Sequence, residues 1–257
     1  MTSAIIEFLS KNSIPSSSHL PLVHTTPAYY LPKILKEKVI DPRPCDTFIG
    51  EDLAYFFYGR PAYKFGESQQ DAKYWELPAL VIIDYDQVSP KRTFPFDSGA
   101  FKKYPNFISM MDRDEFDAAT VIDAAPKIVG SFFVDATRYF KMMPRSAQGF
   151  NNQFAIDALD VEIKALQELA LSFTNKIDDR RMSIELQSSE SVKLVEKKVL
   201  AVIMPEEYGY SSKLMEWIKA LGAQPIFYPV WPLRQEMYYA AIYSLVFEFY
   251  RSKNLVR

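Results

Sequence analysis

This sequence is poor in cysteine, histidine and glycine, and each shortage excludes a class of protein. A single cysteine, Cys45, rules out an intramolecular disulfide framework and a cysteine-based zinc site, and it fits a reducing cytoplasm. With only two histidines in 257 residues, a histidine-rich metal site is not expected either. The net charge of −2 argues against the broadly basic surface that holds duplex nucleic acid through many phosphates.

The common nucleotide-binding and hydrolase motifs are also missing. The chain has neither G-x-G-x-x-G nor G-x-x-x-x-G-K-[ST], so a bound dinucleotide would not lie on a glycine-rich turn. It has no G-x-S-x-G and no H-E-x-x-H, and its N-terminus lacks the features of a secretory signal. The apolar stretch 237–250 carries Glu248 and is shorter than the roughly 20 residues that cross a bilayer. We therefore expect a buried C-terminal helix at about 235–252 and no membrane partner.

The remaining pattern predicts an α+β protein, and we treat residues 1–257 as a single domain. Strands and helices follow one another without the regular alternation of a doubly wound sheet. Apolar runs bounded by turn residues predict strands, and apolar residues three and four apart predict helices. The expected strands are 20–25, 53–59, 79–85, 127–134, 182–187, 198–204 and 225–230, and the expected helices are 29–38, 152–172 and 211–222.

Three chemistry-bearing positions stand in a fixed order along the chain. His24 begins the run His-Thr-Thr at a strand end, and a helix LPKILKE follows. The strand with Tyr55-Phe56-Phe57 comes 31 residues after His24, with Tyr63 shortly beyond it. Glu185 follows much later on the strand MSIELQ. This ordered set resembles the H-Y-E signature of the ADP-ribosyltransferase fold, and its arrangement is similar to that of the PARP-like branch and the DarT-type toxins.

The resemblance covers roughly residues 20–65 and 180–205. It implies an α+β core made of a split β-sheet with flanking helices. It also implies an NAD-dependent ADP-ribosyltransferase that takes NAD as a substrate and needs no metal. By the same resemblance the chain acts as a cytoplasmic toxin or defence effector. Its acceptor, a protein or a nucleic acid, and its oligomeric state are not written in the sequence.

The implied chemistry is the cleavage of the bond between nicotinamide and ribose. That reaction passes through an oxocarbenium-like centre, so the site must stabilise positive charge and hold the leaving ring. The resemblance makes Glu185 the catalytic residue, hydrogen-bonded to the ribose 2′-hydroxyl. Tyr55 and Tyr63 would stack against the nicotinamide ring.

Three further residues would bind the rest of NAD. His24 would form a hydrogen bond to the ribose on the adenosine side, and Thr26 would help to fix the strand that carries it. We assign Arg60, in the turn FYGRPAY, to the pyrophosphate because the guanidinium fork matches phosphate geometry. We expect His24, Tyr55, Tyr63 and Glu185 to converge on one cleft between two small sheets.

Each assignment has a simpler structural alternative. His24 can be a structural histidine, Tyr55 a core aromatic, and Arg60 the partner of a surface acid. Glu185 competes for the carboxylate role with Glu51, Asp52 and Glu190. Ile184 and Leu186 alternate with Glu185 and would face away from it, which favours Glu185.

Two questions stay open at this stage. The segment 94–107, FPFDSGAFKKYPNF, contains an Asp-Ser-Gly turn and is either a substrate-facing loop or a plain connection. The whole chain is either an enzyme or a non-catalytic module on the same fold that binds a nucleotide or a protein.

Overall fold

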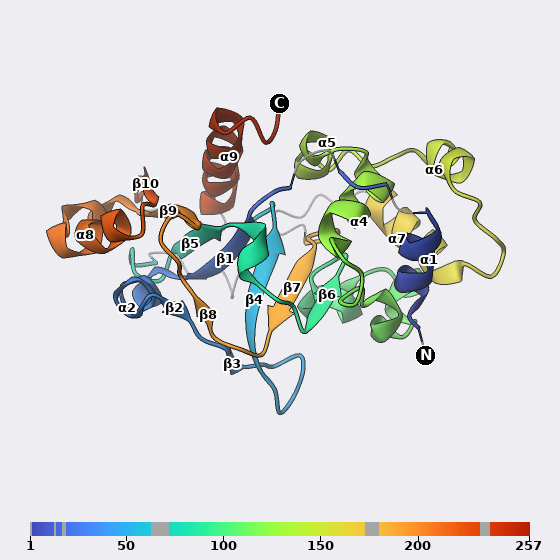
Figure 1. Cartoon of the computed structure of the whole chain (residues 1–257), viewed down its shortest axis with the longest axis horizontal. Helices are drawn as coiled ribbons and strands as arrows, with labels where there is room; N and C mark the ends of the chain where they lie inside the picture. Colours follow the sequence, from blue (N-terminus) through green and yellow to red (C-terminus); the bar gives the residue numbers. More distant parts are fainter. Residues whose placement is uncertain (1, 13, 17–18, 63–71, 173–179, 232–236) are drawn as a thin grey trace.

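The protein has a mixed α+β architecture with a central sheet and flanking helices (Figure 1). The computed structural model describes residues 2–12, 14–16, 19–62, 72–172, 180–231 and 237–257. Along the central sheet the strand order is β10-β9-β5-β1-β4-β7-β6, and β3 pairs with β4 beside this path. The pair β9–β10 is parallel and the other neighbours are antiparallel. The strands are β1 (Leu22–Pro27), β3 (Arg43–Pro44), β4 (Asp52–Tyr58), β5 (Pro78–Ile83), β6 (Arg92–Phe94), β7 (Glu185–Ser188), β9 (Val199–Pro205) and β10 (Gln224–Tyr228), with β2 (Val39–Ile40) and β8 (Val192–Lys193) forming a separate pair.

Most helices lie toward the two ends of the sheet, and α9 stands between these two groups (Figure 1). Helices α2 and α8 contact each other near β10, whereas α1, α4 and α7 pack together near β6. Among the helices of the described ranges, none combines the length and apolar character that crossing a bilayer requires. The helices are α1 (Ala4–Asn12), α2 (Leu31–Glu37), α3 (Asn106–Ser109), α4 (Ala124–Phe133), α5 (Ala136–Phe140), α6 (Ala147–Gln153), α7 (Val161–Leu171), α8 (Ser212–Ala220) and α9 (Met237–Ser252).

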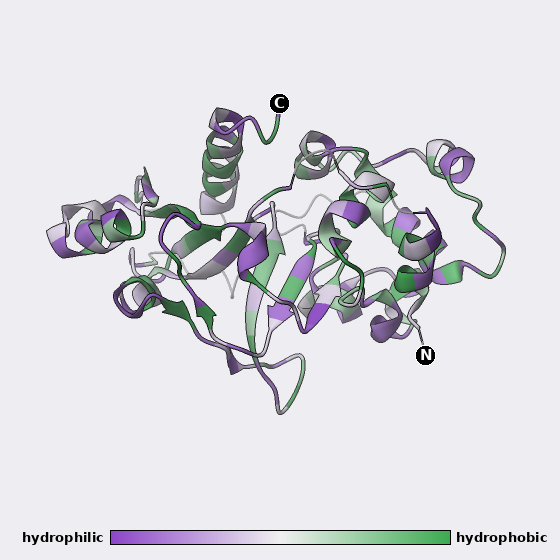
Figure 2. Cartoon of the chain, in the orientation of Figure 1, coloured by the Kyte–Doolittle hydropathy of each residue, from purple (hydrophilic) through white to green (hydrophobic). Residues whose placement is uncertain are grey.

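Several predicted elements are confirmed close to their expected bounds. The apolar runs become β1, β4, β5, β7, β9 and β10, and Figure 2 shows the hydrophobic residues on β5 and β9. Helix α8 starts at the predicted cap, where the Ser211 hydroxyl accepts a hydrogen bond from the Leu214 N–H at 3.3 Å. Just beyond its end Gly222 takes a φ of +70°, a conformation that glycine adopts without strain.

The prediction of a strand at 127–134 is wrong, because this segment belongs to helix α4. Apart from Lys127, every residue of α4 is buried, so the sequence has no polar face that would reveal a helical period. Gly130 lies directly against the chain near Ile14, where an added Cβ would fall 1.6 Å from the Ile14 carbonyl oxygen. Close packing of this helix, rather than β-propensity, decides its structure.

The expected helix at 152–172 begins only at Val161. In the segment before Val161, the side chains of two aspartates accept hydrogen bonds from backbone N–H groups that would otherwise bond within a helix. The Leu159 N–H donates to Asp157 Oδ1 at 3.0 Å, and the Asp157 N–H donates to Asp160 Oδ2 at 2.6 Å. Such local hydrogen bonds compete with helix formation, and they leave Leu159 84% exposed.

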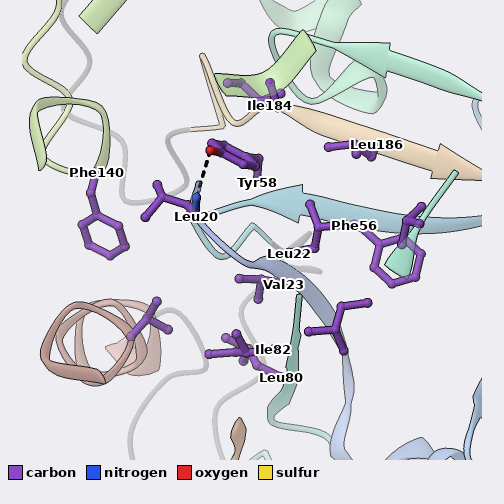
Figure 3. Close-up of a cluster of buried hydrophobic side chains, with 14 of the residues drawn as sticks. Leu20, Leu22, Val23, Phe56, Tyr58, Leu80, Ile82, Phe140, Ile184 and Leu186 are labelled. Carbon is purple, nitrogen blue, oxygen red and sulfur yellow. Dashed lines mark hydrogen bonds between the residues drawn. The ribbon is translucent and has the colours of Figure 1, made fainter. Parts of the chain in front are cut away.

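A layer of apolar side chains packs on one face of the central strands. Figure 3 shows Phe56 and Tyr58 of β4 in this layer, together with Ile184 and Leu186 from the β7 segment. The Leu20 N–H donates to the Tyr58 hydroxyl at 2.9 Å, which satisfies the polar end of a fully buried ring. Because side chains alternate along a strand, the residues between these face the opposite side of the sheet.

Candidate active site

The candidate site lies where strands β1 and β4 separate. β1 pairs with β5 along all six of its residues, but it pairs with β4 at only two positions, Leu22 with Tyr58 and Val23 with Phe57. Beyond Val23 a single side chain bridges the two strands: the His24 ring forms a hydrogen bond through Nδ1 to the Tyr55 carbonyl oxygen at 2.9 Å. The sheet therefore opens between its two halves at this point.

Two cavities share part of their lining at this opening. The larger has a volume of about 620 Å³ and the smaller about 400 Å³, both within the usual range for ligand sites. Glu185 and Phe57 line only the larger cavity, whereas His24 and Arg43 line only the smaller one. The residues that line both are Thr25, Thr26, Pro27, Pro44 and Tyr55.

Glu185 reaches the larger cavity because of the register of β7. Phe57 of β4 stands opposite Glu185, and Tyr55 opposite Gln187, so these four side chains share the face turned away from the apolar layer. The sequence-based expectation that Ile184 and Leu186 face away from Glu185 is confirmed (Figure 3).

The Glu185 carboxylate is 1% exposed and is held by three donors. The Ser98 hydroxyl donates to Oε1 at 2.6 Å and the Ser98 N–H to Oε2 at 3.1 Å. Gln187 Nε2 donates to Oε1 at 2.6 Å. Gln187 is itself oriented by Arg92, which donates to its Oε1 at 3.2 Å and pairs with Glu51.

Opposing effects set the charge of Glu185. Burial, and next the nearby Asp97 carboxylate, raise the pKa of Glu185 to about 8. The hydrogen bonds from Ser98 and Gln187 act in the opposite direction, because they favour the ionised form. The carboxyl group of Glu185 is therefore largely protonated at pH 7, and a neighbouring cation would favour its ionisation.

The hydroxyl of Tyr55 is held by Cys45, the only cysteine in the sequence. Cys45 Sγ and the Tyr55 hydroxyl are 2.7 Å apart. The same sulfur accepts hydrogen bonds from the N–H groups of Thr47 and Phe48, at 3.3 and 3.2 Å. Burial raises the pKa of Tyr55 well above its usual value, so its hydroxyl stays neutral. Tyr55 and Phe57 thus give the cavity two positioned aromatic side chains.

His24 and Glu185 do not share one cleft, contrary to the sequence-based expectation. His24 follows Leu22 on the face of the apolar layer, with its ring centroid 5.5 Å from that of Phe56. Burial lowers the pKa of His24 to about 4, although the hydrogen bond to Tyr55 opposes this change. The ring is neutral at pH 7, and since a carbonyl can only accept, Nδ1 carries the proton and Nε2 is an acceptor.

The other predicted NAD-binding residues have different positions. Thr26 lines both cavities. Arg60 is 3% exposed and lies away from them, donating to Met142 Sδ at 2.8 Å and to the Arg181 carbonyl oxygen at 3.4 Å. Tyr63 falls outside the described residues.

Of the competing carboxylates, Glu51, Asp52 and Glu190 do not line the larger cavity. Glu51 accepts hydrogen bonds from Arg92 and Lys91, which lower its pKa to about 2. Glu190 is exposed beyond the end of β7. The carboxylates that do line this cavity are Asp46, Glu76, Asp97 and Glu185.

Sequence reasoning missed the partners of Glu185. Ser98 and Asp97 belong to the segment 94–107, which the sequence left as either a substrate-facing loop or a plain connection. The S-x-E-x-Q pattern around Glu185 gave one available signal, because Gln187 must share the face of Glu185 on a strand. Nothing local indicated Arg180, whose guanidinium lies 2.9 Å from Asp97 Oδ2.

A buried carboxyl group beside two aromatic side chains can hold a planar cationic ring and stabilise positive charge on an adjacent carbon. In the part of the chain that the structure describes, no three histidine, cysteine or acidic side chains are grouped to hold a metal ion. Comparison with protein-family models, with curated proteins and with solved structures gave no match for this chain.

Proposed function

We propose that the chain is an NAD-dependent ADP-ribosyltransferase on a split-sheet fold, with NAD passing through the opening between β1 and β4. The observation that carries this proposal is that two cavities share five lining residues at that opening, one cavity being lined by Glu185 and the other by His24. A ligand with a cationic ring at one end and a nucleoside at the other matches this arrangement.

In the larger cavity, Glu185 is the catalytic residue. As the bond between ribose C1′ and the nicotinamide nitrogen breaks, its electron pair leaves with the neutral nicotinamide, and C1′ becomes oxocarbenium-like. The Glu185 carboxylate stabilises this charge, and an acceptor then attacks C1′ and loses a proton. The positive ring of bound NAD favours ionisation of Glu185 before the reaction begins.

The aromatic residues of this cavity hold the leaving group. Tyr55 and Phe57 offer rings on the same face of β4 as Glu185 on β7. Cys45 fixes the Tyr55 hydroxyl at 2.7 Å, which limits the rotation of the ring. Restricted aromatic side chains bind a planar group with little loss of conformational entropy.

In the smaller cavity, His24 and Arg43 bind the adenosine half and the phosphates. The neutral His24 ring can accept a hydrogen bond from a ribose hydroxyl through Nε2. Arg43 takes the pyrophosphate role first assigned to Arg60, because it lines this cavity and its guanidinium lies 3.6 Å from the Tyr30 ring centroid. Arg60 is instead a packing residue.

A second candidate is a nucleotide-binding module without catalysis. The observation that favours it is the 1% exposure of Glu185, whose two oxygens already accept three hydrogen bonds. A module of this kind would bind NAD and release no nicotinamide.

The deciding experiment is nicotinamide release from NAD by wild type and by Glu185→Gln, with water, proteins or nucleic acids as acceptors. The substitution keeps size and removes charge, so the rate should fall by roughly 100-fold or more while the NAD-dependent rise in melting temperature persists. Glu190→Gln, an exposed glutamate past the end of the same strand, is the matched control and should retain the wild-type rate.

Two results would contradict this assignment. Wild-type protein that binds NAD and releases no nicotinamide with any acceptor supports the binding module. Equal release by wild type and Glu185→Gln shows that another group is the catalytic residue, and Asp97 in the same cavity would be the first to test.

A further inference from the structure

The turn Asp97–Gly99 is clamped to the chain just before β7. The Asp97 side chain accepts a hydrogen bond from the Ala100 N–H at 3.1 Å and so starts the short 3-10 helix Ser98–Lys103. Arg180 donates to the other Asp97 oxygen at 2.9 Å. The Tyr104 hydroxyl is 3.1 Å from the carbonyl oxygens of both Asp97 and Arg180. Side chains on both sides thus fix the position of the turn.

This turn presents Ser98 to the carboxylate of Glu185. The hydroxyl and the N–H of Ser98 each contact a different carboxylate oxygen, at 2.6 and 3.1 Å. Gln187 Nε2 contacts both residues, because it donates to Ser98 Oγ at 3.1 Å and to Glu185 Oε1 at 2.6 Å. Ser98 and Gln187 are both almost fully buried, so water does not replace these contacts.

We propose that Ser98 is a positioning residue for Glu185: its two donors orient the carboxylate in the larger cavity, and the Asp97–Arg180 ion pair holds the turn that carries it. This inference rests on the proposed function, since the orientation of Glu185 matters for catalysis only if Glu185 acts there. It gives a role to part of the segment 94–107, whose residues Asp97, Gly99 and Lys103 also line the larger cavity.

The contacts of Ser98 also control the charge of Glu185. The charged and titratable groups near the carboxylate are Asp97 on the turn, Arg180 before β7 and Tyr55 on β4. Asp97 and burial oppose ionisation, and Ser98 is one of the two side chains whose donors favour it. A hydrogen bond between a neutral donor and a charged acceptor in a buried site is among the stronger kinds.

The kinetic test compares the pH profile of nicotinamide release for wild type, Ser98→Ala and Ser98→Thr. Loss of the hydroxyl should move the rising limb of kcat/KM by about one pH unit to higher pH, which is about a tenfold loss of rate at pH 7. Ser98→Thr, which restores a hydroxyl, should recover part of the loss. Ser188→Ala is the control, because Ser188 is a buried serine on the opposite face of β7.

A second measurement does not depend on activity. Thermal unfolding of Ser98→Ala is compared with wild type at pH 6 and at pH 9, and again in the Glu185→Gln background. The variant should lose more stability at pH 9, where Glu185 is ionised and needs its donors, and this extra loss should vanish in the Glu185→Gln background.

The two readouts separate the possible failures. No nicotinamide release by wild type overturns the proposed function, and with it the catalytic meaning of the Ser98 contact. A pH-independent loss of stability that is the same in both backgrounds overturns the coupling of Ser98 to Glu185 itself. Unchanged pH profiles in an active Ser98→Ala enzyme overturn the positioning role.

Discussion

Protonation of His24 should be a main reason why this fold weakens in acid. In the folded chain burial lowers the pKa of His24 from 6.5 to about 4. The unfolded chain therefore binds a proton between these two values and the folded chain does not. Stability from this group is fully present above pH 6.5 and is lost as the pH falls toward 4.

The size of the effect follows from the two pKa values. At 1.36 kcal/mol per pKa unit, the full difference corresponds to about 3 kcal/mol. When the pH falls from 8 to 5, proton binding by the unfolded chain lowers the free energy of unfolding by about 2 kcal/mol. For a chain of this size this lowers the melting temperature by roughly 4–8 °C. The charged groups that line the same cavity are Lys33, Glu37, Asp41 and Arg43.

The assay therefore measures a difference between variants. His24→Asn keeps an N–H donor near the Tyr55 carbonyl oxygen but does not titrate. The stability of wild type relative to His24→Asn should fall by about 2 kcal/mol from pH 8 to pH 5 in urea unfolding. His19→Asn, which removes the exposed second histidine, is the control for losing a histidine as such. Parallel pH curves for wild type and His24→Asn would refute a half-buried, neutral His24 that bridges β1 and β4.

Three further results are expected. Glu185→Gln should reduce the fall in unfolding free energy at higher pH. The raised pKa of Glu185 costs stability as the pH rises from about 4.5 toward 8, and glutamine does not titrate. If the variant loses stability with pH as steeply as wild type, the carboxyl group is not buried. Gly99→Leu should raise the KM for NAD several-fold, because Gly99 lines the larger cavity, and should also cost some stability, because the new Cβ would lie 3.1 Å from Asp97 Oδ1; unaltered NAD titration would argue for binding elsewhere. Gly130→Ala should destabilise the fold by about 2 kcal/mol or more, since the new Cβ would overlap the Ile14 carbonyl; a wild-type melting temperature would contradict this packing.

The strands β1, β4, β5, β7, β9 and β10 could be predicted because each carries its own signal, whereas the short strands β2, β3, β6 and β8 were not predicted. β4, β5 and β9 are apolar runs bounded by turns, and alternation around Glu185 correctly placed Ile184 and Leu186 on the opposite face. Helix α4 could not be predicted this way, because it is buried on nearly all sides and its sequence shows no amphipathic period.

The composition of the site depends on contacts between distant residues, which periodicity does not reveal. Ser98 contacts Glu185 across 87 residues. The face on which His24 lies depends on the register of β1 with β4, which no local pattern specifies. Arg60 was assigned to a phosphate from its residue type and its place in a turn, and neither signal indicates that it would be buried beside Met142 and line neither cavity.

The most direct test of the central claim is a crystal structure with a non-hydrolysable NAD analogue bound. The account predicts that the ligand passes through the opening between β1 and β4, with its nicotinamide end beside Glu185 and Tyr55 and its adenosine ribose within hydrogen-bond distance of His24 Nε2. A ligand held entirely on one face of the sheet, or bound away from this opening, would contradict it.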